Sequence, residues 1–257
     1  MERNQSMKKS RLIEDLIDAG AKNSATVKDA RVGISWTAVH GKYCGLAKTY
    51  GVPVKHGNYT RNMGHLNRLT TLELAEYAHS WNLVEASLGC AAISSMIAPP
   101  ANSTDINAQT MIMEKGAGAN VVIVGAFPFT NRLMGIAKQA CVLELDPFQL
   151  DPRQGILPDS AAEYVIPDCD LLIMTGSTLI NKSMERLLAL ARSSHAYTII
   201  LGPSTIMSEV LFDYGAHMLA GAFVTHPEAV IGKLTQSGGM LNGKVCAGEM
   251  IFKVMQR

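Results

Sequence analysis

Two hydrophobic patterns alternate along the second half of the chain. Short runs that are apolar at nearly every position are separated by segments in which apolar residues recur with helical spacing. The apolar runs are VVIVGAF, CVLELDP, LLIMTGST, TIILGPST and MLAGAFV, and the helical segments are NRLMGIAKQ (Asn131–Gln139), INKSMERLLALARS, MSEVLFDYGA and PEAVIGKLTQSGG. Uniformly apolar strands that alternate with helices are typical of parallel sheets buried on both faces. The pattern therefore predicts an α/β fold with a parallel sheet and helices on both of its faces.

The first half lacks this rhythm. Ser6–Ala19 has the spacing of an amphipathic helix, with apolar residues at i, i+1, i+4 and i+5 counted from Leu12. Further expected elements are a strand over Val32–Val39, helices over Leu72–His79 and Leu83–Ile97, and a helix from the N-cap Asp105 to Lys115. The glycines of GAG at 116–118 end that last helix. We therefore expect an α+β domain over residues 1–116 and an α/β domain over residues 117–257.

Composition and charge narrow the class of protein. The chain of 257 residues is 47% hydrophobic and 18% charged, which suits a large aliphatic core. A net charge of +1 gives no reason to expect nucleic acid or an anionic membrane surface as a partner. No apolar run reaches the roughly 18 residues of a membrane span, and no secretory signal follows the charged start. The expectation is a cytoplasmic protein, whose apolar composition and 14 methionines permit a homodimer.

Small and polar residues end the predicted strands, and two of these turns carry hydroxyls. TGST (Thr175–Thr178) and GPST (Gly202–Thr205) each stand between an apolar strand and a helical segment. Hydroxyls and free backbone N–H groups at the positive end of a helix form an anion site. The alternative is that these hydroxyls only cap the helices, because Ser and Thr are preferred capping residues. Two such turns in successive units would face the same crevice at the carboxyl ends of the strands.

The turn GAFPFT after Val124 resembles the start of a nucleotide-binding domain but lacks its glycines. A dinucleotide fingerprint needs three glycines so that the backbone can approach a pyrophosphate, whereas only Gly125 is present. Phe127 and Pro128 would obstruct the approach, which argues against a conventional NAD or FAD mode. Glu144 ends the next strand, where a ribose-binding acid would stand. A solvated carboxylate at a strand end is the alternative for this residue.

Local spacing identifies no metal site and no nucleophile. The seven histidines form no HxxxH or HExxH pattern, and none stands near a cysteine at zinc-ligand spacing. A site assembled from distant residues stays open, for example around His40 and Cys44. The five cysteines are scattered without a CxxC pair, which fits reduced thiols. No GxSxG elbow occurs, so no catalytic residue is assigned.

Six motifs together resemble a known family. They are VGISWTAVHGKYCGLAKTYG (32–51), LGCAAISS (88–95), VVIVGAFPF (121–129), LLIMTGSTLINKS (171–183), IILGPST (199–205) and HMLAGAFVT (217–225). In order and spacing they are similar to the putative heavy-metal chelation proteins of bacteria and archaea. The resemblance implies a first domain similar to the amino-terminal domain of enolase and a second, Rossmann-like domain. It also implies that the cleft between the domains is the functional site.

The resemblance also marks individual positions of this sequence. The residues that match recurrent family positions are Trp36, Thr37, Gly45, Gly125, Phe127, Pro128, Glu144, Thr175, Gly176, Thr178, Asn181, Gly202, Pro203, Ser204, Thr205 and Gly221. One position departs from the family pattern, because the segment AAxNA of relatives reads AAISS here and Ser94 stands in place of the amide. The expected lining of the cleft consists of these family positions except Gly45 and Gly221, together with Ser94 and Ser177. The shorter hydroxyl of Ser94 could alter ligand selectivity or be structural.

Two functional hypotheses follow. In the first, the cleft binds a small anionic molecule or metal chelate in metal transport or homeostasis, because helix ends favour negative charge. A divalent or heavy metal would take oxygen ligands from Glu144 or Asp146 and a thiolate from Cys44. In the second, the protein is a transferase or lyase that uses a nucleotide-type ligand in metallophore or cofactor metabolism, and Glu144 holds the ribose. A scaffold role is a third reading, in which the hydroxyl turns are caps.

Overall fold

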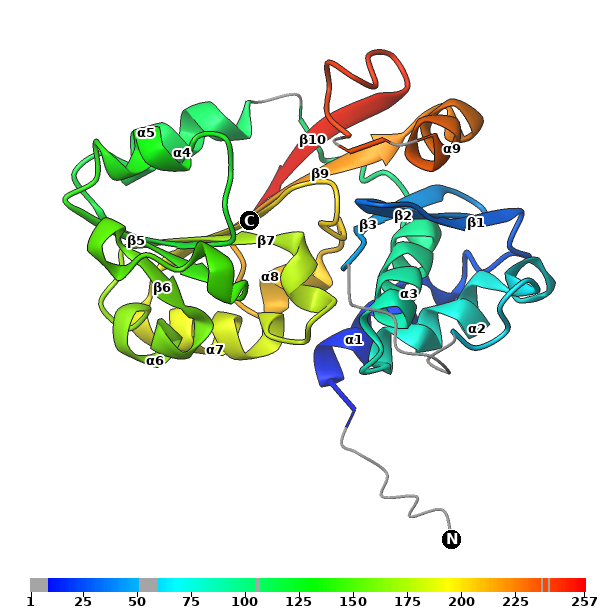
Figure 1. Cartoon of the computed structure of the whole chain (residues 1–257), viewed down its shortest axis with the longest axis horizontal. Helices are drawn as coiled ribbons and strands as arrows, with labels where there is room; N and C mark the ends of the chain where they lie inside the picture. Colours follow the sequence, from blue (N-terminus) through cyan, green and yellow to red (C-terminus); the bar gives the residue numbers. More distant parts are fainter. Residues whose placement is uncertain (1–8, 51–59, 105–106, 237, 240) are drawn as a thin grey trace, which may run out of the picture.

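The computed structural model describes residues 9–50, 60–104, 107–236, 238–239 and 241–257, and it holds two sheets (Figure 1). The larger sheet has seven strands in the order β10-β9-β8-β7-β4-β5-β6. Its strands are β4 (Asn120–Val124), β5 (Gln139–Glu144), β6 (Ile156–Pro158), β7 (Leu171–Thr175), β8 (Tyr197–Leu201), β9 (Met218–Val224) and β10 (Met250–Gln256). All neighbours are parallel except β10, which pairs antiparallel with β9. Strand order reverses between β4 and β7, as in doubly wound dinucleotide-binding sheets.

Helices cover both faces of this sheet, as the alternating pattern predicts. The first face carries α4 (Ala108–Gly116) and α5 (Thr130–Met134), and the second carries α6 (Ala162–Val165), α7 (Met184–Ser194) and α8 (Val210–Asp213). On the first face Ile112 and Leu133 pack with Ile123. The helix predicted over Asn131–Gln139 is shorter than expected, because β5 already begins at Gln139. The sequence pattern also missed the short edge strand β6 and the antiparallel edge strand β10.

The smaller sheet is antiparallel, with the order β1-β2-β3. Its strands are β1 (Asp29–Val32), β2 (Trp36–His40) and β3 (Cys44–Lys48). The single strand predicted over Val32–Val39 is wrong, because the chain reverses direction within it. Gly33 donates its backbone N–H to the carbonyl of Trp36 at 2.9 Å and closes this turn. A side chain on Gly33 would meet Leu234 at 2.7 Å, so the turn accepts glycine best.

The helices of the first half are locally well specified. α1 (Arg11–Ala21) begins after Ser10, whose hydroxyl accepts from the backbone of Ile13, and α3 (Leu83–Met96) begins after the N-cap Asn82. α2 (Thr71–Ala75) starts with a capping box and continues into the 3-10 helix η2 (Glu76–His79). The start of the predicted helix Ser6–Ala19 and the predicted cap Asp105 lie outside the described residues. Within the described part, Asn107 caps α4.

The small sheet is covered by one helix from each half of the chain. On one face α3 packs against Val39 and Ala47. On the other face α9 (Pro227–Thr235) contributes Val230, Ile231 and Leu234 to a cluster with Ala38 and Leu46. Neighbouring residues of β2 and β3 thus point to opposite helices, as the period of a strand requires. Figure 1 shows α9 lying above this sheet and α3 below it.

The packing of helix α4 bears on where the boundary between the two predicted domains lies. It ends at Gly116, inside the first predicted domain, yet its Ile112 is buried against the large sheet. The packing therefore favours a boundary ahead of α4 rather than after it. None of the helices among the described residues is long and apolar enough to cross a membrane.

Candidate functional site

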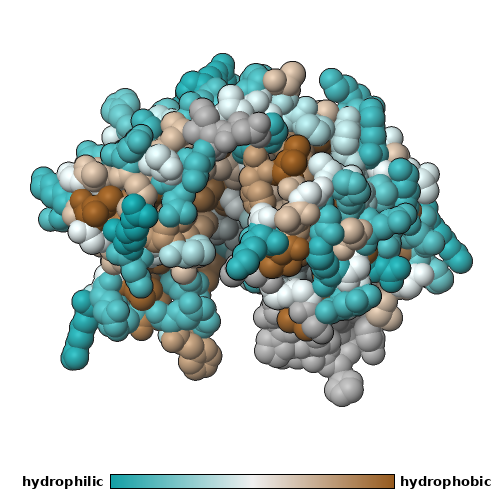
Figure 2. Space-filling view, turned by 90° about the horizontal axis from the view of Figure 1, so that it is seen from above, coloured by the Kyte–Doolittle hydropathy of each residue, from teal (hydrophilic) through white to brown (hydrophobic). Residues whose placement is uncertain are grey.

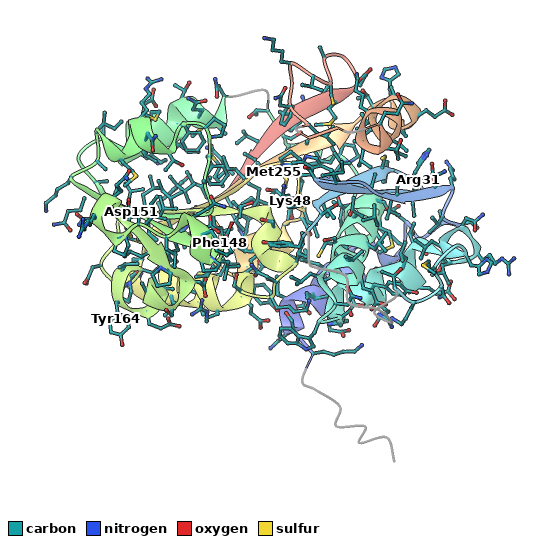
Figure 3. The ribbon with its side chains drawn as sticks, viewed as in Figure 1. Arg31, Lys48, Phe148, Asp151, Tyr164 and Met255 are labelled. Atoms are coloured by element: carbon teal, nitrogen blue, oxygen red, sulfur yellow. The ribbon has the colours of Figure 1, made fainter. Side chains whose placement is uncertain are left out.

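The carboxyl edge of the parallel sheet meets the end of the small sheet. The backbone N–H of Lys48, at the end of β3, donates to the hydroxyl of Ser204 after β8 at 2.9 Å. The hydroxyl of Ser87 on α3 donates to the carbonyl of Lys48 at 2.8 Å. In the side-chain view Lys48 lies between the two sheets (Figure 3). We call the contact of Lys48–Tyr50 with the turns after β7 and β8, together with Trp36 opposite Lys48 in the small sheet, the junction.

The TGST turn after β7 uses its hydroxyls locally. The hydroxyls of Thr175 and Ser177 lie 2.9 Å apart, and Thr178 donates its hydroxyl to the carbonyl of Thr175 at 2.8 Å. The turn opens the four-residue 3-10 helix η6 (Gly176–Leu179), whereas the long helix α7 begins only at Met184. The turn thus opens a short helix, and the anion site expected here stays a prediction. The capping alternative describes this turn, since Thr175 accepts from the backbone N–H of Ser177 at 3.3 Å.

The GPST turn after β8 is likewise not followed directly by a long helix. Residues 206–209 follow it without helical structure, and α8 starts only at Val210. Ser204 is buried and its hydroxyl is the acceptor for Lys48. The two turns also touch each other, because a side chain on Gly176 would come within 2.5 Å of the backbone nitrogen of Thr205. The paired turns do lie together, but most of their hydroxyls bind protein groups.

Tyr50 links the small sheet to the β7 turn. The amide of Asn181 donates to the hydroxyl of Tyr50 at 3.4 Å, and Ser177 is a second side-chain partner. Burial raises the pKa of Tyr50, these two hydrogen bonds lower it, and the charge of Glu144 raises it further. The phenol therefore stays protonated and lies close enough to Glu144 to respond to its charge. Sequence reasoning missed Lys48 and Tyr50, although both stand in the motif GLAKTYG.

Two buried polar atoms at the junction have no hydrogen-bond partner among the described residues. They are the indole Nε1 of Trp36 and the hydroxyl of Thr205. Trp36 lies directly across from Lys48 in the β2–β3 register, and Thr205 follows Ser204 in the chain. The ammonium of Lys48 stands 5.8 Å from the centre of the Trp36 ring. Buried polar groups are rarely left unpaired, so each of these two atoms stands out among the polar groups of this region.

Three of the residues predicted to line the cleft or to bind a metal make contacts within the first half of the chain or with α9. Thr37 is fully buried and shares a hydrogen bond of 2.8 Å with Thr49. Ser94 lies on α3 against Gly45, roughly two helical turns from Ser87. Cys44 is buried with Ala38 and α9, and burial raises the pKa of its thiol to about 12. In this apolar setting the uncharged thiol of Cys44 is the favoured form, and the thiolate ligand expected from Cys44 stays a prediction.

The GAFPFT turn and the end of β5 form a separate pocket of about 260 Å³. Phe127, Pro128 and Glu144, all predicted site residues, line it together with Thr130, Asn131, Met134, Gln149, Gln154 and Ile156 among others. Gly125 turns the chain at the end of β4 with a φ of 84°, a conformation that glycine adopts readily. The pocket lies beside the point where strand order reverses, at the carboxyl ends of β4 and β5. The sequence analysis placed these groups in one cleft with the hydroxyl turns.

The donor groups do not favour a bare metal ion at either place. The junction offers hydroxyls, an amide, an indole and an ammonium, and none of the five cysteines has a lowered pKa. One group of three potential ligands occurs in the described part, formed by Glu14, Glu76 and His79. The ammonium of Lys9 already binds both of these carboxylates, at 3.1 and 3.0 Å. Asp146 caps a turn, and Glu144 binds its neighbours' backbone.

Comparison with known proteins identifies the family. Residues 107–249 match the DUF364 family and residues 13–97 match the DUF4213 family, both described as putative heavy-metal chelation. A DUF364 protein of unknown function from Desulfitobacterium hafniense has 23% identity and a TM-score of 0.74, over 95% of this chain and 99% of that one. Another, from Pyrococcus horikoshii, has 22% identity and a TM-score of 0.75, over 96% and 99%. No curated protein matches. The DUF364 match spans more than half of the chain, so the protein belongs to this putative heavy-metal chelation family.

Proposed function

We propose that the protein binds a small anionic organic ligand, of the kind that carries a metal as a chelate, at the junction. The observation that supports this is the pair of unpartnered buried atoms, Trp36 Nε1 and the Thr205 hydroxyl. An indole N–H only donates, a hydroxyl can donate, and the neighbouring Lys48 ammonium is also a donor. A ligand rich in acceptors, such as a carboxylate, suits donors of this kind and would meet the exposed Lys48 first. The surface is hollowed between the two parts of the molecule (Figure 2).

The chemistry of the junction favours a chelate over a free ion. Soft metals select thiolates, and hard cations select clustered carboxylate or carbonyl oxygens. The described junction residues supply neither set, whereas a chelate brings its own metal ligands and presents carboxylates outward. This reading keeps the metal-linked role in the family description and assigns the metal's ligands to the small molecule.

Calorimetric titration with citrate, iron(III) citrate and zinc chloride tests the proposal. We expect citrate or its iron complex to bind and zinc alone not to bind at the junction. Lys48→Met should weaken binding at least tenfold, about 1.4 kcal/mol. Lys138→Met is the matched control, because Lys138 is exposed before the start of β5, at the opposite edge of the sheet. Zinc binding that Lys48→Met leaves intact, without citrate binding, would contradict the proposal.

Thr205→Val gives a second and sharper readout. The substitution keeps the shape of the side chain and removes a hydroxyl that is 2% exposed and unpartnered. Without ligand, the free energy of unfolding should rise by about 1 kcal/mol, because an unsatisfied buried group is removed. Binding of the anion should weaken at the same time. A loss of stability without any change in binding would show that the hydroxyl serves the fold instead.

A further inference from the structure

We infer that the pocket at the ends of β4 and β5 binds a nucleoside with a free ribose diol and no phosphate. This site is separate from the junction, so the inference goes beyond the proposed function. It begins with the carboxylate of Glu144, which lines the pocket at the end of β5. The second strand of a doubly wound sheet is where an acidic residue binds the ribose hydroxyls of a nucleotide. Glu144 occupies that position in the strand order observed here.

The carboxylate is held ready for such a ligand. Its Oε1 accepts from the backbone N–H groups of Leu145 at 2.7 Å and Asp146 at 3.0 Å. No described residue donates a hydrogen bond to Oε2, which is therefore available to two neighbouring hydroxyls. A carboxylate fixed by one oxygen has lost its rotational freedom before the ligand arrives, and this lowers the cost of binding.

The pocket walls suit an aromatic base. Phe127, Pro128, Met134 and Ile156 provide apolar surface, and the ring of Phe127 is itself stacked on Phe129 with centroids 5.3 Å apart. The volume of about 260 Å³ lies just below the roughly 300–1,000 Å³ range of small-molecule pockets. The space therefore admits one nucleoside rather than a dinucleotide.

An exposed aromatic ring stands next in the chain to a residue that lines the pocket. Phe148 is 97% exposed, although it stands in the 3-10 helix η3 (Pro147–Gln149), which also supplies Gln149 to the pocket lining. The carboxylate of Asp146 accepts from the Phe148 backbone at 3.0 Å and from the Gln149 amide at 2.9 Å, and so fixes this turn. An aromatic ring of this kind can stack on a base, which would remove its apolar surface from water.

The turn after β4 excludes a phosphate. Gly125 is the only glycine of the fingerprint, and the N–H of Phe127 already donates to the hydroxyl of Thr130 at 2.9 Å. Pro128 has no N–H to offer. A phosphate at this turn would find few donors, whereas a nucleoside whose 5′ position is neutral or cationic needs none.

Titration with adenosine, 2′-deoxyadenosine and AMP tests the inference. Adenosine should bind, 2′-deoxyadenosine should bind at least tenfold more weakly, and AMP should bind no more tightly than adenosine. Glu144→Gln should abolish the preference for the ribose diol, and Phe148→Ala should weaken adenosine and 2′-deoxyadenosine alike. Matched controls are Glu114→Gln and Tyr164→Ala, which change an exposed carboxylate on α4 and an exposed ring on α6. Figure 3 shows Tyr164 well apart from Phe148.

Several results would overturn the inference. They are the absence of saturable binding by adenosine, guanosine, cytidine and uridine, equal binding of the deoxy analogue, or clearly tighter binding of AMP. The thermal midpoints of Glu144→Gln and Phe148→Ala should match the wild type, which separates lost binding from lost folding. Trp36→Phe should leave adenosine binding unchanged, so this test can fail while the junction proposal holds, and the reverse.

Discussion

The β7–β8 stretch and the β4–β5 stretch of the same sheet edge use their polar groups in opposite ways. Behind β7 and β8 the hydroxyls of Thr178 and Ser204 bind protein backbone, and only Thr205 is left without a partner. Behind β4 and β5 one oxygen of Glu144 accepts from the backbone, none of the described residues donates to the other, and Phe148 is exposed. The first stretch joins the two halves of the chain, and the second is arranged around an open pocket. The polar turns after β7 and β8 therefore hold the two halves of the chain together, whereas those after β4 and β5 are available for a ligand.

The largest test of this comparison is Gly176→Ala, in the assembling stretch. The added Cβ would lie 2.5 Å from the backbone nitrogen of Thr205 and 2.7 Å from the carbonyl carbon of Ser204. Backbone atoms cannot move aside cheaply, so we expect a loss of about 3 kcal/mol in the free energy of unfolding. Urea denaturation measures it.

The control for this substitution is Gly232→Ala in α9. An added Cβ there meets nothing within 4 Å. Removing a glycine from a helix should raise the free energy of unfolding by about 1 kcal/mol. If Gly176→Ala were as stable as the wild type, the two turns would not be packed as tightly as described.

Ser204→Ala should have an intermediate effect. It leaves the backbone N–H of Lys48 without its acceptor at the junction. An unsatisfied buried donor costs about 2 kcal/mol, measured as a lower midpoint in urea. Ser193→Ala, which removes an exposed hydroxyl on α7, should change the free energy by less than about 0.5 kcal/mol. Equal effects of the two variants would mean that Ser204 does not hold the small sheet.

The smallest effect is expected from the pH dependence of Tyr50, which is hydrogen-bonded behind β7 and responds to the charge of Glu144 behind β5. Burial raises its pKa, so the folded state favours the protonated phenol. The resulting stability is complete below the ordinary pKa of 10 and is lost as the pH rises through the folded-state pKa. Tyr50→Phe should therefore flatten the fall of the free energy of unfolding above pH 10, measured by urea titrations on either side of that pH.

Glu144→Gln sharpens the same measurement. The charge of Glu144 raises the pKa of Tyr50, so the neutral variant should bring the phenol's pKa closer to its ordinary value. Ultraviolet titration of the phenolate, with Tyr50→Phe as the blank, follows this change. Identical phenol titrations with and without the carboxylate would show that the pocket and the junction are electrostatically separate.

The sequence predicts the second half of the fold well because its signals are local. A uniformly apolar run such as Leu171–Met174 excludes most alternatives to a buried parallel strand, and the structure confirms it as β7. The strand predicted over Val32–Val39 failed because a tight turn lies within it, closed by the hydrogen bond from Gly33 to the carbonyl of Trp36, and the apolar residues on either side hide that turn. Short edge strands such as β6 carry too few residues for any periodic signal.

The candidate site, like the fold, could be predicted from the sequence only where the signal is local. Phe127, Pro128 and Glu144 were predicted from their positions at strand ends, and the structure brings them together in one pocket. The use of Ser204 could not be predicted, because a hydroxyl looks the same in sequence whether it receives a ligand or a backbone N–H from 156 residues away. Phe148 was not predicted as a site residue, because a single exposed ring produces no periodic pattern in the sequence.

The cover that α9 provides for the small sheet has a consequence for how the gene can be divided. Val230, Ile231 and Leu234 close a face of the small sheet, whose own residues Ala38, Cys44 and Leu46 come from the first family segment. A fragment that stops before α4 would expose Ala38 and Leu46 to water and would be prone to self-association. The two segments are therefore obliged to be inherited and expressed together, and separately expressed halves should recover solubility only when they are mixed.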